Sequence, residues 1–278
     1  MISILSAPAE ESPFQAWQIL LARHRSRQVL AFVILTVLLA IASWRCQVRV
    51  GTFLLGIRKG LAVLDMFFPP DWSAIPSLLQ PMAVTLVLAM IATIMGMALS
   101  FPCALAASSN IAPAPLRMLI RSFIALERAL PEVIQLLLLI AIFGLGIISG
   151  LIALSLSSIG MLAKLLADSI EEIEPKVLNA VAATGATNIQ VIRYAVIPQI
   201  LPALLANGLF RFEFNVRAVI ILGAVGVGGI GFEMSAAMRS LNYQRACAAT
   251  LLTLVLVFLI ERLSDRIRGH ILSEGLVR

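Results

Sequence analysis

Residues 80–107, QPMAVTLVLAMIATIMGMALSFPCALAA, contain no charged side chain, and the uncharged stretch around them extends from Asp71 to Arg117. The hydrocarbon core of a bilayer is about 30 Å thick, so a helix needs about 20 mainly apolar residues to cross it. Pro81 lies at the start of the stretch, and Pro113 marks the turn that follows it. The stretch therefore predicts a membrane-spanning helix.

The composition of the whole chain agrees with this prediction. Of the 278 residues, 60% are hydrophobic and only 13% are charged, against roughly 25% in soluble domains. The mean hydropathy is +0.99. A soluble enzyme, a disordered chain and a secreted disulfide scaffold are excluded, because their surfaces could not carry so much apolar side chain. Aromatic residues are 6%, and the alternating pattern of a membrane β-barrel is missing. We expect an all-α polytopic membrane protein.

The net charge of +6 does not indicate nucleic-acid binding, because the basic residues flank apolar stretches instead of lining one surface. The excess of positive charge is better explained by the basic residues that commonly flank membrane spans on their cytoplasmic side. The three cysteines are far apart in sequence and the two histidines have no metal-ligand spacing, so no metal site is expected.

The hydropathy pattern predicts about six spans with both termini in the cytoplasm. A cleaved signal peptide is the alternative for the first of them, although its apolar stretch is long for that purpose. The predicted spans cover residues 28–44, 80–107, 117–145, 151–167, a stretch that begins near Pro202, and 245–262.

These spans imply a division of the chain into five parts. A cytoplasmic segment (1–27) precedes the first span, and a basic cytoplasmic tail (265–278) follows the last one. Residues 45–79 are expected outside the cytoplasm, with an amphipathic helix that lies in the interface and ends at the prolines after Phe68. Residues 80–264 form the core domain.

One long polar segment, residues 168–200, interrupts the core domain. Pro175 and Gly185 predict two short helices that meet at a glycine turn, the second continuing to Pro198. The small side chains from Asn179 to Thr184 would let another surface approach closely. Composition alone fits an ordinary helix–turn–helix equally well.

The spacing within this segment resembles the EAA loop of ABC-importer permeases. That pattern is Glu-Ala-Ala, three residues, Gly, nine residues, then Ile-x-Leu-Pro. Here Ala180, Gly185 and Pro198 match it. Four positions depart from it, since Asn179, Val181, Ala195 and Ile197 replace Glu, Ala, Ile and Leu.

The surrounding residues resemble phosphonate-transport permeases more specifically. The resemblance covers roughly residues 68–268 and is carried by 68–73, 163–166, 173–175, 182–187, 196–199, 210–217 and 226–231. It implies the MetI-like type I permease fold. It also implies that the chain is the transmembrane subunit of an ATP-driven importer for phosphonate, phosphite or a related phosphorus oxyanion in the bacterial inner membrane.

The same resemblance implies partners. Two copies of the chain would form the pore, a cytoplasmic ABC ATPase dimer would bind ATP and magnesium, and a periplasmic binding protein would deliver the anion. The chain itself would carry no cofactor and would not be an enzyme. The residues implied for ATPase coupling are Asn179, Ala180, Ala183, Thr184, Gly185, Ala186, Thr187 and Pro198.

The glycine-rich motifs are consistent with that division of labour. The chain lacks the Gly-x-x-x-x-Gly-Lys-Ser/Thr phosphate loop of an ATPase. Gly226-x-Gly228-x-x-Gly231 does match a dinucleotide fingerprint. It lies beside a membrane span and outside any βαβ pattern, so a close-packed turn or re-entrant segment at the outer face is the better interpretation.

Ionisable residues at membrane depth are functional candidates because they are costly to bury in lipid. Arg128 with Glu132, and Glu213 with Arg217, are spaced i,i+4 and so can pair along one helix face. The pairs either fix helix packing or expose an arginine to the transport pathway, where a guanidinium suits a tetrahedral oxyanion. The candidate pathway residues are Arg217, which we favour, Arg211, Glu213, Arg128 and Glu132.

Two rival functions lack sequence support. A stand-alone secondary anion transporter commonly has paired internal repeats, and the two halves of the chain show no convincing self-similarity. An intramembrane enzyme would need a catalytic motif such as His-Glu-x-x-His or Gly-x-Ser-x-Gly, which the sequence lacks.

Overall fold

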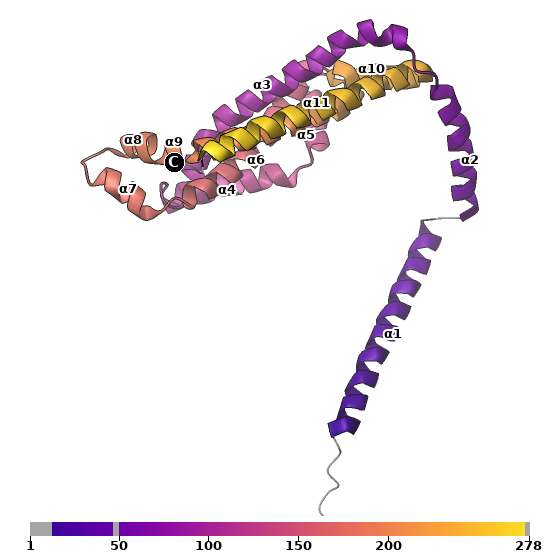
Figure 1. The fold of residues 1–278 in the computed structure, drawn as a ribbon, viewed down its shortest axis with the longest axis horizontal. Coiled ribbons are helices and arrows are strands. Elements are labelled where there is room, and N and C mark those ends of the chain that lie inside the picture. The colour runs from indigo at the N-terminus through magenta and orange to yellow at the C-terminus, as the bar shows by residue number, and fades with distance from the viewer. Residues whose placement is uncertain (1–12, 47–49, 276–278) are drawn as a thin grey trace, which may run out of the picture. The chain divides into compact units, whose positions relative to one another are not determined.

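A computed structural model of the chain describes residues 13–46 and 50–275, and within them all regular structure is helical. The chain divides after Asp65 into two compact units. Figure 1 labels the helices of both units.

In the described part of the N-terminal unit there are two helices, α1 and most of α2, and their described side chains, from residue 28 onward, are mainly apolar and exposed. α1 (Pro13–Arg45) starts before the span expected at 28–44 and includes it. None of residues 28–45 is buried, and Phe32 and Trp44 are 70% and 76% exposed. Such a surface is stable in contact with lipid. α2 (Val50–Phe67) is the helix predicted before the prolines, and it ends at Phe67.

The C-terminal unit contains the remaining elements. They are the short 3₁₀ helix η1 (Trp72–Ala74), α3 (Ile75–Ala107), α4 (Ala114–Ala129), α5 (Glu132–Phe143), α6 (Ile147–Glu171), α7 (Pro175–Ala182), α8 (Asn188–Val191), the π-helical turn η2 (Ile192–Val196), α9 (Ile197–Leu222), a second π-helical turn η3 (Gly223–Val227), α10 (Gly229–Arg239) and α11 (Tyr243–Gly275).

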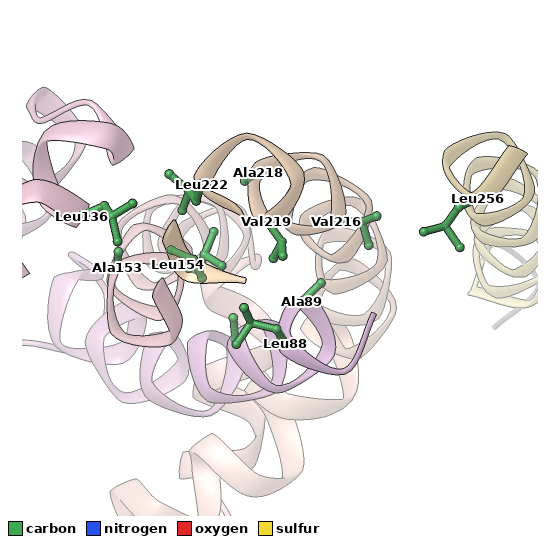
Figure 2. Close-up of a cluster of buried hydrophobic side chains, with 12 residues drawn as sticks. Leu88, Ala89, Leu136, Ala153, Leu154, Val216, Ala218, Val219, Leu222 and Leu256 are labelled. Carbon is green, nitrogen blue, oxygen red and sulfur yellow. The ribbon is translucent and has the colours of Figure 1, made fainter. Parts of the chain in front are cut away.

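Helices α3, α6 and α9 form the centre of this unit. α3 and α6 run in the same direction, because Gly96 lies against Ser158 and, further on, the N–H of Ser109 donates to Glu171. α11 runs antiparallel to α9. The largest apolar core joins these helices to α5, and its labelled members include Leu88, Leu154 and Val219 (Figure 2).

Five helices of the described residues are long and apolar enough to cross a membrane. The predicted all-α, polytopic fold class is confirmed. The single span predicted over 117–145 is wrong, because Leu130 is extended and α4 and α5 end and begin on either side of it. The physical reason is Pro131, which disfavours helical backbone at the residue before it. α5 is a shorter apolar helix.

The polar segment and the start of the fifth span also differ from the expected boundaries. α6 continues to Glu171, and Pro198 lies in the first turn of α9 instead of ending a helix. Pro202, the expected start of the fifth span, lies inside α9. The glycine-rich stretch is a close-packed turn, as predicted. A Cβ atom on Gly231 would overlap the carbonyl oxygen of Ile220, so only glycine allows this approach.

The contact between α3 and α6 depends on the missing side chain of Gly96. A Cβ atom there would overlap the Cβ of Ser158. We expect Gly96→Val to lower the free energy of unfolding by about 1–3 kcal/mol, the usual cost of overpacking. The measurement is the unfolding midpoint of the detergent-solubilised protein. Gly60→Val is the matched control, since no atom lies within 4 Å of its Cβ position. Equal midpoints for the two variants would contradict the tight contact.

Candidate functional site

The segment between α6 and α9 extends beyond one end of the helices of the C-terminal unit (Figure 1). α7 begins at Pro175, whose missing N–H costs nothing at the first turn of a helix. α8 begins after Thr187, whose side chain forms a capping box with Gln190. The two short helices predicted from the sequence are therefore present, and proline and a capping pair define where they begin.

Gly185 makes the turn between these helices. Its φ is +82°, in the left-handed region that glycine adopts readily, and its N–H donates to the carbonyl of Ala182 at 3.0 Å. No atom lies within 4 Å of its Cβ position. The glycine is thus required by the backbone conformation and leaves open space in front of the turn.

Most of the predicted coupling residues flank that turn, and Pro198 lies further along the chain, in the first turn of α9. Seven of the eight are exposed, namely Asn179, Ala180, Ala183, Thr184, Gly185, Thr187 and Pro198, and Ala186 is half-buried. The structure adds Ile189 and Tyr194, which are 78% and 63% exposed. Sequence reasoning missed these two, although an isolated isoleucine after a capping residue was a detectable signal.

The opposite face of the segment is anchored. Ile173 and Val196, at its two ends, are buried in a core that includes Leu166 and Ile170 of α6. Val177 and Leu178 of α7 pack on the same core. Because both ends and the α7 face are held by apolar contacts, displacement of the exposed surface would move the membrane helices with it.

The buried arginine of α9 is the centre of a polar network. Arg211 is 2% exposed, and its Nη2 donates to Glu132 Oε1 at 2.8 Å and to Ser157 Oγ at 2.9 Å. Its Nε donates to Ser158 Oγ at 2.9 Å. The guanidinium also lies over the ring of Phe214. One arginine thereby links α9 to α5 and α6.

The network continues one turn further along α9. Asn215 Nδ2 donates to Thr93 Oγ1 at 2.8 Å and to Ser158 Oγ at 3.1 Å. Asn215 is fully buried, and so are Ser158 and almost all of Thr93. These bonds include α3 in the network. Sequence reasoning did not select Thr93 or Asn215, because their partners are distant in sequence.

A buried carboxylate lies near this network. Glu127 is 6% exposed, and Gln135 Nε2 donates to its Oε1 at 2.9 Å. Its Oε2 has no hydrogen-bond partner and lies where a Cβ atom on Gly160 would be. The missing side chain of Gly160 thus makes room for the Glu127 carboxylate.

One of the two i,i+4 pairs predicted from the sequence, Glu213 with Arg217, belongs to a charge cluster between α9 and α11. Arg217 lies 3.9 Å from Glu213 and also pairs with Glu261. Arg268 pairs with Glu213 at 2.5 Å. The i,i+4 pair of Glu213 and Arg217 is confirmed. Arg217 is 44% exposed at its side chain, whereas Arg211 is enclosed within the subunit.

The other predicted pair, Arg128 with Glu132, is wrong. The break at Pro131 removes the continuous helix that the i,i+4 spacing requires, and Glu132 binds Arg211 instead. In the described part of the chain Arg128 forms no ion pair. Its side chain lines a small cleft beside α6.

These features agree with the comparisons with known proteins. Residues 96–272 match the family described as "Binding-protein-dependent transport system inner membrane component". The match covers most of the chain, including every element from the end of α3 to α11. The chain belongs to this family and is a multi-pass membrane protein.

Two relatives show how similar the chain is to individual members of transport systems. The phosphite transport system permease protein PtxC of Stutzerimonas stutzeri is 34% identical over 232 residues, covering 83% of this chain and 84% of that protein. The phosphate-import permease protein PhnE of Mycolicibacterium smegmatis is 39% identical over 213 residues, covering 76% of this chain. The aligned part spans only 40% of the length of that second relative.

Solved structures support the fold. The chain resembles a subunit of the inward-facing MetNI methionine ABC transporter, with a TM-score of 0.63 and 22% identity, covering 72% of this chain and 99% of that one. A subunit of a bacterial alginate ABC transporter matches with a TM-score of 0.58 and 16% identity, covering 90% of this chain and 99% of that one. The MetI-like permease fold is therefore confirmed.

The burial of Arg211 leads to a prediction about stability. Arg211→Met would leave the Glu132 carboxylate without its cation, and breaking a buried pair costs about 3–5 kcal/mol. The measurement is the unfolding midpoint in detergent. Arg217→Met is the control, since a half-exposed pair contributes about 0–1 kcal/mol.

A double variant tests the cause of that loss. Glu132→Gln removes the unpaired charge, so Arg211→Met/Glu132→Gln should recover part of the stability lost in Arg211→Met. If Arg211→Met unfolds at the wild-type midpoint, Arg211 does not hold the helices together.

Proposed function

We propose that this chain is the transmembrane permease subunit of an ATP-driven importer for phosphonate, phosphite or a related phosphorus oxyanion. The observation that carries the proposal is the exposed surface of α7, Gly185 and α8, anchored on its other side to the apolar core. A surface built in this way suits the transfer of motion from a partner to the membrane helices.

The chemistry of that surface favours a protein partner. Small residues around Gly185 allow close approach, and the exposed Ile189 offers an apolar side chain for a pocket. The proposed partner is an ABC ATPase dimer that binds ATP and magnesium, so that the permease chain needs no cofactor and catalyses no reaction. Two copies of the chain would form the pore, and a periplasmic binding protein would deliver the anion.

The proposed ATPase contact also determines the proposed orientation of the C-terminal unit in the membrane. The α7–α8 segment and the end of α11 lie at the same end of the C-terminal unit (Figure 1). With the ATPase in the cytoplasm, that end is cytoplasmic. The basic residues near the end of α11, among them Arg262, Arg266 and Arg268, then lie on the side that the positive-inside rule prefers.

The proposed cargo rests on the relatives. Two of them bear names that refer to phosphite transport and phosphate import. A third, described as a putative cryptic phosphonate transport permease, PhnE2 of Escherichia coli, is 42% identical over 120 residues, covering 43% of this chain and 98% of that protein. Tetrahedral phosphorus oxyanions are the chemistry that these names share.

The first experiment is ATP hydrolysis in proteoliposomes. The chain is co-expressed with the ATPase and binding protein from the same gene cluster, and phosphonate, phosphite, hypophosphite and phosphate are titrated singly. We expect one of them to stimulate hydrolysis. Anion uptake driven by a proton or sodium gradient without ATP would contradict the proposal and favour a secondary transporter.

The coupling role of Gly185 has a direct test. Gly185→Leu would strain the left-handed backbone by about 1–2 kcal/mol and fill the space before the turn, so we expect loss of ATPase capture in a pull-down with normal membrane insertion. Gly185→Asn, which tolerates that backbone, should retain part of the binding.

Gly269→Leu is the control for side-chain size, because its Cβ position is also open. Capture of the ATPase by Gly185→Leu at the wild-type level would remove the turn from the coupling role.

The proposed pathway residue is Arg217, with Arg211, Glu213, Arg128 and Glu132 as the other candidates from the sequence. The partial exposure of Arg217 favours it, because the Arg211 guanidinium is buried and already donates to Glu132 and two serines. We expect Arg217→Ala to reduce anion-stimulated transport without loss of the assembled complex.

The control for this variant is Glu261→Gln, which breaks the same ion pair but retains the arginine. Equal transport losses in the two variants would assign Arg217 to helix packing alone.

A further inference from the structure

One glutamine side chain bridges the break between α4 and α5. Gln135 Nε2 donates to three oxygens at the end of α4, namely the carbonyl of Glu127 at 3.2 Å, the carbonyl of Leu130 at 3.1 Å and Glu127 Oε1 at 2.9 Å. The side chains of Gln135 and Glu127 are both buried, with 4% and 6% of each residue exposed. These two side chains therefore hold the end of α4 against the start of α5.

Each of the two side chains has one oxygen that lacks a donor. Glu127 Oε2 and Gln135 Oε1 are closed off from solvent, and neither accepts a hydrogen bond from any residue that the structure describes. Glu127 Oε2 lies in the space left by the missing side chain of Gly160, and Arg128 Cγ is 3.3 Å from the same Cβ position. An ionised carboxylate oxygen without a donor is strongly unfavourable in such surroundings.

The carboxyl group of Glu127 lies near the middle of the membrane. Gly160, which it contacts, is 13 residues after Ile147 and 11 residues before Glu171, the two ends of α6. These separations correspond to about 20 Å and about 16 Å at 1.5 Å per residue. α6 is long and apolar enough to cross the bilayer, whose hydrocarbon core is about 30 Å thick. An unpaired charge is costly at this depth.

The cations near Glu127 do not form an ion pair with it. Arg211 and Arg128 act on its carboxyl group through space, and so does the carboxylate of Glu132. The hydrogen bonds of Arg211 to described residues go to Glu132, two serines and Met161. Glu132 thus already supplies the negative charge that Arg211 needs, and it would repel a second carboxylate beside it.

The other cations of this region have carboxylates of their own. The cleft beside Arg128 is also lined by Arg121 and Lys164. Arg121 pairs with Glu171 at 2.5 Å, and Lys164 pairs with Asp168. Neither of these two cations therefore compensates a negative charge at the helix break.

We propose that Glu127 is held as a neutral carboxylic acid and forms, with Gln135, a proton-dependent clasp across the helix break. The proton on Glu127 Oε2 is donated to Gln135 Oε1, while Gln135 Nε2 donates to Glu127 Oε1. One proton then satisfies both of the oxygens that lack a donor, and it removes the buried charge. Loss of the proton would leave a negative charge in the break and remove one of the bonds, so α4 and α5 would be joined less tightly. This inference does not depend on the proposed transport function.

Infrared spectroscopy of the full-length chain in detergent at neutral pH detects this proton directly. A protonated carboxyl group has a carbonyl stretching band that a carboxylate lacks, and exposed Asp and Glu side chains are ionised at this pH. We expect a band in the wild type that is lost in Glu127→Gln and retained in Glu132→Gln. Gln135→Leu should shift the band, because it removes the acceptor of the proton. Gln199→Leu, which removes an exposed glutamine, is the matched control and should not shift it.

Unfolding midpoints in detergent give an independent measurement. Glu127→Gln keeps a neutral side chain of the same shape, whose amide can donate to Gln135 Oε1, so we expect it to unfold at the wild-type midpoint. Glu132→Gln leaves the buried Arg211 without its anion and should unfold earlier.

Four results would overturn the inference. A wild-type spectrum without the band, or a band that persists in Glu127→Gln, would mean that Glu127 is ionised. Equal destabilisation by Glu127→Gln and Glu132→Gln would make Glu127 a structural anion. An unshifted band in folded Gln135→Leu would mean that the proton is not donated to Gln135. Circular dichroism verifies that each variant is folded, and the wild type and Glu127→Gln decide the protonation even if Gln135→Leu does not fold.

Discussion

The buried guanidinium of Arg211 constrains the rest of the helix bundle. At membrane depth no water is available to solvate it, so every donor must find an acceptor inside the protein. Glu132, Ser157 and Ser158 accept from Nη2 and Nε, and Nη1 donates to Met161 Sδ at 3.5 Å. Glu132 can do so because the chain breaks at Pro131 and a new helix starts at the carboxylate, where a negative charge is also favoured by the helix dipole. The helix break and the ion pair are thus parts of one arrangement.

Features that depend on neighbouring residues could be predicted from the sequence. The length and hydropathy of 80–107, 151–167 and 245–262 place those stretches in long helices, and the glycine at 185 identifies a turn because few other residues adopt its backbone conformation. The helix break at Pro131 could also have been predicted, because a proline disfavours helical backbone at the residue before it. The long apolar stretches on both sides of Pro131 favoured a single span instead.

Features that depend on distant residues could not be predicted. Arg211 finds Glu132 79 residues away, and Asn215 finds Thr93 122 residues away. The i,i+4 spacing predicted that Glu132 pairs with Arg128, which is closer in sequence. Local spacing cannot show that tertiary packing brings a different cation to Glu132. For the same reason the cleft beside Arg128 was invisible in the sequence. Its three cations come from two helices, and only the fold brings them together.

The close contact of α3 with α6 has a mechanical consequence. Where Gly96 lies against Ser158, a shift of one helix along the other by about one turn would bring a residue with a larger side chain into the gap, Thr93 or Ser100 in place of the glycine. The two helices therefore have a single register and slide poorly. We therefore expect α3 and α6 to move as one rigid unit. A displacement at one end of the pair would be transmitted to the other end with little internal deformation.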